Sequence, residues 1–389
     1  MSYIASNDNR FYAALETSYG QAAAAGAQGR MPALKLTARQ RNEKAARKDK
    51  TGSRTFVGNP AGLRRTTNFD LKTYMTGWTD HSAPPPHGSL FQAALGGAPL
   101  AWGGGTAGAG STVSRVVFSA PHGLQPGQAV SSGAELRFVS ALVDDHTVQL
   151  AAPLSAAPAA GAALSATTTY VPAEELPSAT IFDYWSPGSA VQRILYGTAV
   201  EQLTVSINGD FHEFAFSGYA CDVLDSASFQ SGQAGLSAFP AEPAVSGLNY
   251  SIIPGHLGQA WLGTAPDEFF TLTKADIVLK NDLELRDKEF GSTLARGISP
   301  GIRVVTVDFD LYAMNDNATK GLYQAARQRS PVSVVLQLGE QAGQLFGVYL
   351  KSVIPEVPEF DDAERRLQWT FRENRAQGSV NDEIFFAFG

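Results

Sequence analysis

Alternation of apolar and polar residues with a period of two is the feature that most constrains this chain. In residues 66–74, Phe69 and Leu71 alternate with polar side chains, and in residues 301–312 Val305 and its apolar partners do the same. This period places successive side chains on opposite faces of a half-buried strand. The chain also has 38 Gly and 21 Pro among its 389 residues, which supply turns between short strands. We therefore predict a mainly β fold.

Two stretches of the chain are rich in hairpin signals. Asn208-Gly209 joins the strand-like residues 199–208 to residues 211–217, and Asn-Gly is the strongest short hairpin signal. Residues 275–285 and 301–312 form a second expected pair. The two stretches suggest a weak internal duplication, although they share no clear residue-level repeat.

Helical signals are few. Residues 318–328 are expected to form the one long helix, capped by Asn315 or Asn317 and stopped by Pro331. A short helix is expected at Leu90–Leu95, and strands are expected at 332–338, 345–353 and 366–372.

The first 50 residues are predicted to be a basic arm rather than part of a domain. Residues 34–48 are consistent with a short helix that Thr37 caps. The basic side chains considered for assembly contacts are Arg39, Arg41, Lys44, Arg47 and Lys48. Such a run is either a solvated terminus or an arm that docks on an acidic neighbouring subunit.

Residues 106–170 are predicted to be an inserted small β module. The Gly/Ala-rich segments 103–108 and 156–166 flank strand-like pieces and are expected to be flexible joints. The main β core then comprises residues 51–105 and 171–389, because an insertion at a surface loop costs little loop-closure entropy.

Composition excludes several classes of protein. The net charge of −7 argues against a general nucleic-acid binder, and the single Cys221 excludes an intrachain disulfide and a four-cysteine zinc site. No run approaches the ~18 apolar residues that span a bilayer, and residues 1–30 lack a signal-peptide pattern. We expect a protein that is neither secreted nor inserted in a membrane.

Catalytic and cofactor motifs carry little weight in this sequence. Gly103, Gly105 and Gly108 match G-x-G-x-x-G, but a strand-like segment follows where a dinucleotide site needs a helix. The six histidines lack the spacing of a metal site, and His212 and Glu213 are expected to face opposite sides of a strand. We predict no catalytic residue, no metal and no cofactor, and hence not an enzyme.

Several segments together resemble a family of bacteriophage tail tube proteins. These segments are Gly52–Phe56, Leu63–Thr67, Tyr74–Gly77 and Gly88–Gly96, followed at the C-terminal end by a short helix and strands that end in an aromatic tail. The resemblance covers most of residues 51–105 and 171–389. The basic arm and the inserted module go beyond the pattern of the family.

The resemblance implies a tail-tube-type β-sandwich or barrel with one short flanking α-helix. It implies a structural virion protein whose six copies form a ring, with rings stacked into a tube around a tape-measure protein. Terminator and distal tail proteins are further implied partners, and double-stranded DNA passes through the lumen without specific binding. Assembly is expected in the host bacterial cytoplasm.

Electrostatics and topology add expectations about such a tube. Because acidic surfaces repel phosphates, a lumen biased toward negative charge is expected. Six sheets are expected to join edge to edge, with the inserted module outside, so that deleting residues 112–164 leaves tubes intact.

Two alternatives stay open. One is another ring-forming tail component, a terminator or distal tail protein. The other is a carbohydrate-binding β-sandwich of a receptor-binding protein, in which Trp102, Trp185 and Trp261 would form a sugar platform.

Overall fold

Strands make up most of the regular structure, which confirms a mainly β protein. The computed structural model describes residues 3–43, 49–58, 63–244, 251–263, 265, 268–363 and 365–389. Within them, α1 (Gly88–Leu95) and α2 (Asn317–Gln328) are the α-helices, which confirms the two helices expected from the residue pattern, whereas the family resemblance implied one. Short 3-10 turns occupy Ala27–Gly29 and Gln233–Gly235.

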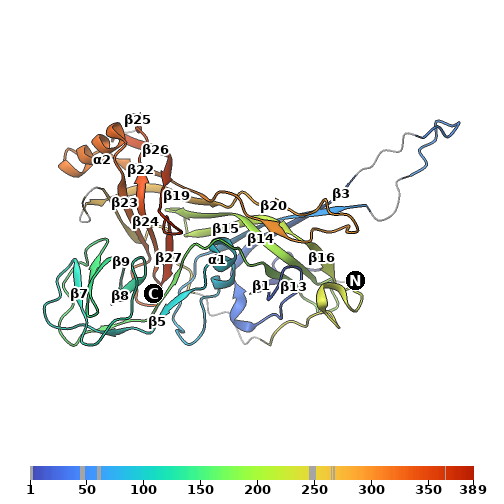
Figure 1. Ribbon diagram of the computed structural model, residues 1–389, viewed down its shortest axis with the longest axis horizontal. Coiled ribbons are helices and arrows are strands. Elements are labelled where there is room, and N and C mark those ends of the chain that lie inside the picture. Colours follow the sequence, from blue (N-terminus) through green and yellow to red (C-terminus); the bar gives the residue numbers. More distant parts are fainter. Residues whose placement is uncertain are drawn as a thin grey trace.

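One long antiparallel sheet, here called the front sheet, runs along the longest axis of the molecule (Figure 1). Its strand order is β3-β4-β15-β14-β19-β22-β26-β25. The bounds are β3 (Ala33–Asn42), β4 (Arg65–Tyr74), β14 (Arg193–Ile207), β15 (Glu213–Ala220), β19 (Leu272–Lys280), β22 (Val304–Tyr312), β25 (Glu359–Asp361) and β26 (Gln368–Ala376).

Two further sets of strands, the back strands, cover the buried face of the front sheet. Their orders are β2-β1-β13-β14-β16 and β18-β17-β23-β24-β27-β12-β5, so β14 belongs to both layers. The bounds are β1 (Asn9–Leu15), β2 (Arg30–Met31), β5 (Leu100–Trp102), β12 (Thr167–Tyr170), β13 (Ala179–Trp185), β16 (Asp222–Asp225), β17 (Gly258–Gly263), β18 (Phe269–Phe270), β23 (Val332–Leu338), β24 (Phe346–Ile354) and β27 (Phe385–Phe388). A separate ribbon pairs β20 (Glu284–Leu285) with β21 (Ile298–Ser299).

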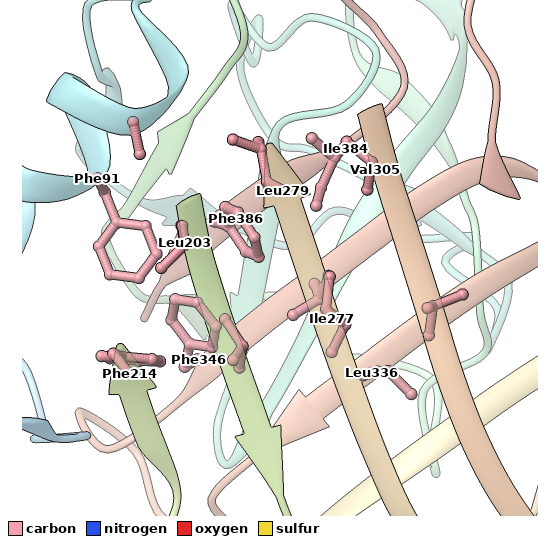
Figure 2. Close-up of a cluster of buried hydrophobic side chains, with 14 of the residues drawn as sticks. Phe91, Leu203, Phe214, Ile277, Leu279, Val305, Leu336, Phe346, Ile384 and Phe386 are labelled. Atoms are coloured by element: carbon pink, nitrogen blue, oxygen red, sulfur yellow. The ribbon is translucent and has the colours of Figure 1, made fainter. Parts of the chain in front are cut away.

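The main core lies between these layers, and the aromatic ring of Phe91 occupies its centre. Figure 2 shows Phe91 of α1 beside Phe214 of the front sheet and beside Phe346 and Phe386 of the back strands. The ring centroids lie 5.1 Å from Phe214 and 5.4 Å from each of the other two. All four rings are fully buried, so α1 fastens the two layers together.

The predicted helix over residues 34–48 is wrong, because residues 33–42 form β3. Leu36 and Ala38 face the core, and Lys35, Thr37 and Arg39 point to the other face, a period of two that pairs well with β4. The N-terminal residues are likewise not a detached arm: β1 forms a full-length antiparallel pair with β13.

The helix at 317–328 is confirmed, but its cap differs from the expected asparagines. Asp316 has an extended backbone and its Oδ1 accepts a hydrogen bond from the Thr319 amide at 2.7 Å, while Asn317 is already the first helical residue. An aspartate at this position both satisfies a free amide and complements the helix dipole.

The inserted module is a small sheet of its own, at the lower left in Figure 1. Its order is β7-β10-β9-β8, with β7 (Arg115–Val117), β8 (Ala129–Ser132), β9 (Glu135–Asp144) and β10 (Thr147–Leu150). Where flexible joints were expected, β6 (Gly105–Thr106) pairs with β11 (Ala163–Leu164) and closes the base of the module.

The module is docked firmly on the back strands through the fully buried Arg137. Its Nη1 donates to Gln337 Oε1 at 2.6 Å, its Nη2 donates to Gln259 Oε1 at 3.1 Å, and its Cζ lies 4.0 Å from the Trp261 ring centroid. A shared apolar cluster includes Phe138 of the module, which stacks on Tyr349 of the body at 5.5 Å. The back strands under the module are therefore buried on both faces.

The internal duplication is confirmed, although the corresponding hairpins are not those expected from the sequence. The chain order β1, β2, β3, β4, α1, β13, β14, β15, β16 recurs as β17, β18, β19, β22, α2, β23, β24 with β25, β26, β27. Every strand pairing of the first unit recurs between its counterparts in the second. The β14–β15 hairpin thus corresponds to β25–β26, and β19–β22 corresponds to β3–β4.

Candidate functional site

The face of the front sheet that points away from the core, here called the polar face, carries small and polar side chains across its width. At its centre lie Thr204 of β14 and Ala215 and Ser217 of β15, opposite one another in register or nearly so. They line a shallow depression together with Thr37 of β3 and Asp70 of β4. These side chains are short, and their period-two alternation with the core residues follows directly from strand geometry.

Most cations in the middle of the polar face are paired with carboxylates of the same face. Lys72 Nζ lies 2.6 Å from Glu213 Oε2, and Lys274 Nζ lies 3.0 Å from Asp276 Oδ2. Such exposed pairs contribute little to stability, but each neutralises one cation of this face. Lys35 and Lys280 are also exposed there, and neither forms an ion pair among the described residues.

Arg372 and Asp310 form a third pair on this face, with 2.6 Å between Nη1 and Oδ1. The hydrogen bond that Arg372 donates to Asp310 and the nearby charges of Asp310, Asp308 and Asp276 raise the pKa of Arg372 above its usual value. The guanidinium in turn offsets repulsion between Asp276 and Asp308, which stand directly opposite each other on β19 and β22.

The two ends of the front sheet are open strand edges with opposite charge. Of the residues that the structure describes, only β4 pairs with β3 and only β26 pairs with β25. Arg39 and Arg41 are exposed on β3, whereas Glu359 and Asp361 are exposed on β25. Figure 1 shows these two strands at opposite ends of the molecule. A basic edge and an acidic edge on one chain suit a head-to-tail contact between copies.

The structure gives the predicted assembly residues a different setting from the one expected. Arg39 and Arg41 lie on a strand edge and line one depression with Asn68 and Tyr219 of the polar face. Lys44, Arg47 and Lys48 lie outside the described residues.

The acidic end was missed by sequence reasoning. The alternation of Phe360 with the acidic residues Glu359 and Asp361 is the signal that indicates a strand there.

The histidines take up separate structural positions. His212 is buried, with its Nε2 2.9 Å from the Leu257 carbonyl oxygen, while Glu213 points to the polar face, as predicted. His146 lies on an exposed turn with its Nδ1 2.7 Å from Asp145 Oδ1, and Asp144 completes this group. Solvated turn groups of this kind are common without a metal, and nothing else in the geometry indicates one.

His87, the N-cap residue of α1, is fully buried against Phe214 and should make folding sensitive to acid. Burial lowers its pKa from 6.5 to about 3, so the unfolded chain binds a proton that the folded chain does not. The contribution of neutral His87 to the free energy of unfolding is therefore fully present above about pH 6.5, and it is lost as the pH drops toward 3. Between pH 7.5 and pH 5 we expect a loss of about 2 kcal/mol in the free energy of unfolding.

Urea unfolding of the wild type, His87→Gln and His146→Gln at the two pH values tests this. In the His87→Gln variant, most of this drop in the free energy of unfolding between the two pH values should disappear. In the control His146→Gln, at an exposed site, the drop should remain. Equal pH dependence in all three proteins would contradict the assignment to His87.

The tryptophans do not form a common platform. Trp261 is buried beneath Arg137, and Trp102 of β5 donates its Nε1–H to the carbonyl oxygen of His122 in the module at 3.0 Å. Trp185 lies at the end of β13 in the first unit. The Gly103–Gly108 segment continues into β7 rather than a helix, which removes the structural context of a dinucleotide site.

No protein-family model matches the chain, and no curated protein sequence matches it. Across the described ranges, none of the helices is long and apolar enough to cross a membrane.

Proposed function

We propose that this protein is the building block of a bacteriophage tail tube. Copies of the chain join side by side into rings, and the rings stack around a tape-measure protein into a conduit for DNA ejection. The observation that carries the proposal is the front sheet, whose outermost strands each pair on one side only within the described part of the chain, and which presents a basic edge at β3 and an acidic edge at β25.

Open edges of this kind are a liability in a monomer, because unpaired strand amides and carbonyls recruit other chains. They are useful where a sheet continues from one subunit to the next. Because the two edges differ, the contact is heterologous, and repeated heterologous contacts close into a ring when the rotation allows.

The polar face of the front sheet is then the wall of the lumen. DNA phosphates bind unpaired Lys and Arg side chains. On this face Lys72, Lys274 and Arg372 are bonded to carboxylates, and Thr204 and Ser217 at the centre are short. In place of the lumen biased toward negative charge that the sequence predicts, we propose a lumen in which these three cations are neutralised by neighbouring carboxylates.

The placement of the module supports the same orientation. It packs on the back strands through Trp261 and Tyr349, on the side away from the polar face. In a tube lined by the polar face, the module lies on the exterior. Deleting residues 112–164 would uncover these apolar side chains. We therefore expect tubes to survive the deletion only if the uncovered residues of the back strands are also replaced by polar ones.

Negative-stain electron microscopy of the purified chain tests the proposal. We expect long hollow tubes at micromolar concentration. Single closed rings that do not stack would favour the alternative of a terminator or distal tail protein. A monomer at every concentration and salt condition would contradict both.

A further inference from the structure

The two structural units of the chain agree in register as well as in topology. In β3–β4 a register shift falls between Ala33 and Lys35, and in β19–β22 it falls between Leu272 and Lys274, at the corresponding place. The β13–β14 and β23–β24 pairs also share a shift after their first matched residue. Bulges at matching positions allow residues of one unit to be assigned to counterparts in the other.

The units meet inside the chain where β14 of the first pairs with β19 of the second. In that junction Val205 stands opposite Ile277, and Thr204 stands opposite Val278. Val205 and Ile277 are both completely buried. By the duplication, β3 is the counterpart of β19 and β25 is the counterpart of the end of β14. The two open edges are therefore the separated halves of a second junction of the same kind.

On the acidic edge, Phe360 is the counterpart of Val205. Phe360 stands opposite Trp369 in β25–β26, and Val205 stands opposite Phe214 in β14–β15. Trp369 and Phe214 correspond because they pair with matching positions of β22 and β4. It follows that Glu359, one residue earlier, is the counterpart of Thr204.

On the basic edge, Ala38 is the counterpart of Ile277. Counted from the shared register shift, Ala38 and Ile277 are each three residues beyond the matched lysines, Lys35 and Lys274. Arg39 is then the counterpart of Val278.

We propose that β25 of one chain pairs antiparallel with β3 of a second copy in the register of the β14–β19 junction, with Phe360 opposite Ala38 and Glu359 opposite Arg39. This inference rests on the proposed function and deepens it. Each chain supplies two equivalent segments of the front sheet, so a ring of six segments contains three chains, not the six expected from the sequence.

Exposure of the edge residues supports this pairing. Phe360 is 57% exposed, although its counterpart Val205 is 0% exposed. Its ring stacks 5.2 Å from Trp369 and lies 6.0 Å from Tyr323 of α2, so it extends the core surface to the rim of the sheet. An incoming β3 would cover it with Ala38, as Ile277 covers Val205.

Charge decides against the symmetric alternatives. Pairing β3 with β3 would bring Arg39 and Arg41 of two chains together, and pairing β25 with β25 would do the same for Glu359 and Asp361. Like charges opposite each other destabilise a sheet, whereas opposite charges stabilise it. The head-to-tail pairing matches Glu359 with Arg39 at every junction.

Cysteine cross-linking of the assembled protein tests both the register and the chain number. The double variant Arg39→Cys with Glu359→Cys places two thiols opposite each other, within the range that a disulfide spans. After mild oxidation of tubes, we expect a non-reducing gel ladder that ends at three chains. Arg41→Cys with Glu359→Cys, two residues out of register, should cross-link about 10-fold less, since the diagonal separation is too long.

The single variants Arg39→Cys and Glu359→Cys control for the buried native Cys221 and should give no ladder. A ladder that continues to six chains would overturn the three-chain ring. Tubes seen by microscopy without any cross-link would overturn the pairing and leave the proposed function standing. A protein that forms neither tubes nor rings would overturn the proposed function itself.

Discussion

Replacing Phe91 with Ala should lower the free energy of unfolding by about 3–5 kcal/mol. The Phe91 ring contacts six other aromatic rings, from the front sheet, from the back strands and from Tyr170 of β12, at centroid distances of 5.1 to 5.7 Å. It is completely buried, so truncation leaves a cavity between two layers that α1 holds together. Urea unfolding at a concentration where the chain is unassembled measures the loss.

Phe290 offers a matched control for the same substitution. It is 100% exposed in the loop that links β20 and β21, and Phe290→Ala should change the free energy of unfolding by less than about 0.5 kcal/mol. Phe91→Leu, which keeps most of the volume, should cost about 1.5 kcal/mol or less. Equal losses in Phe91→Ala and Phe290→Ala would show that α1 does not organise the core.

Local patterns predicted most of the strands, because alternation with a period of two is a property of the segment itself. The strand at 66–74 and the Asn208-Gly209 hairpin needed no tertiary information. A helix was predicted over residues 34–48 because the alternating apolar residues Leu34, Leu36 and Ala38 form only a short run among charged residues. The helical propensity of the segment therefore outweighed its period-two alternation. The cost of such an error is large, since it hid one edge of the front sheet.

The candidate site depends on which strands end up at the rim of the sheet, and that is a non-local property. Arg39 was predicted to contact an acidic neighbour, but nothing in the sequence near Glu359 marks it as the opposite edge. The duplication was equally hard to read, since counterparts such as Val205 and Phe360 share only their place in the fold. The topology conserves position and layer while the side chains differ.

Reversing the charge of Arg39 should raise the concentration needed for assembly by about 10-fold or more at low salt. Arg39→Glu places a carboxylate opposite Glu359 at every proposed junction, and a change from attraction to repulsion of about 1.4 kcal/mol corresponds to that factor. Glu359→Arg should have the same effect. The double variant Arg39→Glu with Glu359→Arg restores opposite charges and should recover most of the assembly.

Sedimentation at about 50 mM and 500 mM NaCl measures this, because screening at high salt should shrink the difference between the single variants and the wild type. Arg115→Glu on β7 of the module makes the same change of net charge at an exposed site away from either edge, and it should assemble like the wild type. If the double variant assembled no better than either single variant, Arg39 and Glu359 would not face each other. The basic edge and the acidic edge would then contact other residues, because the effects of the two charge reversals on assembly cancel only if Arg39 and Glu359 touch each other.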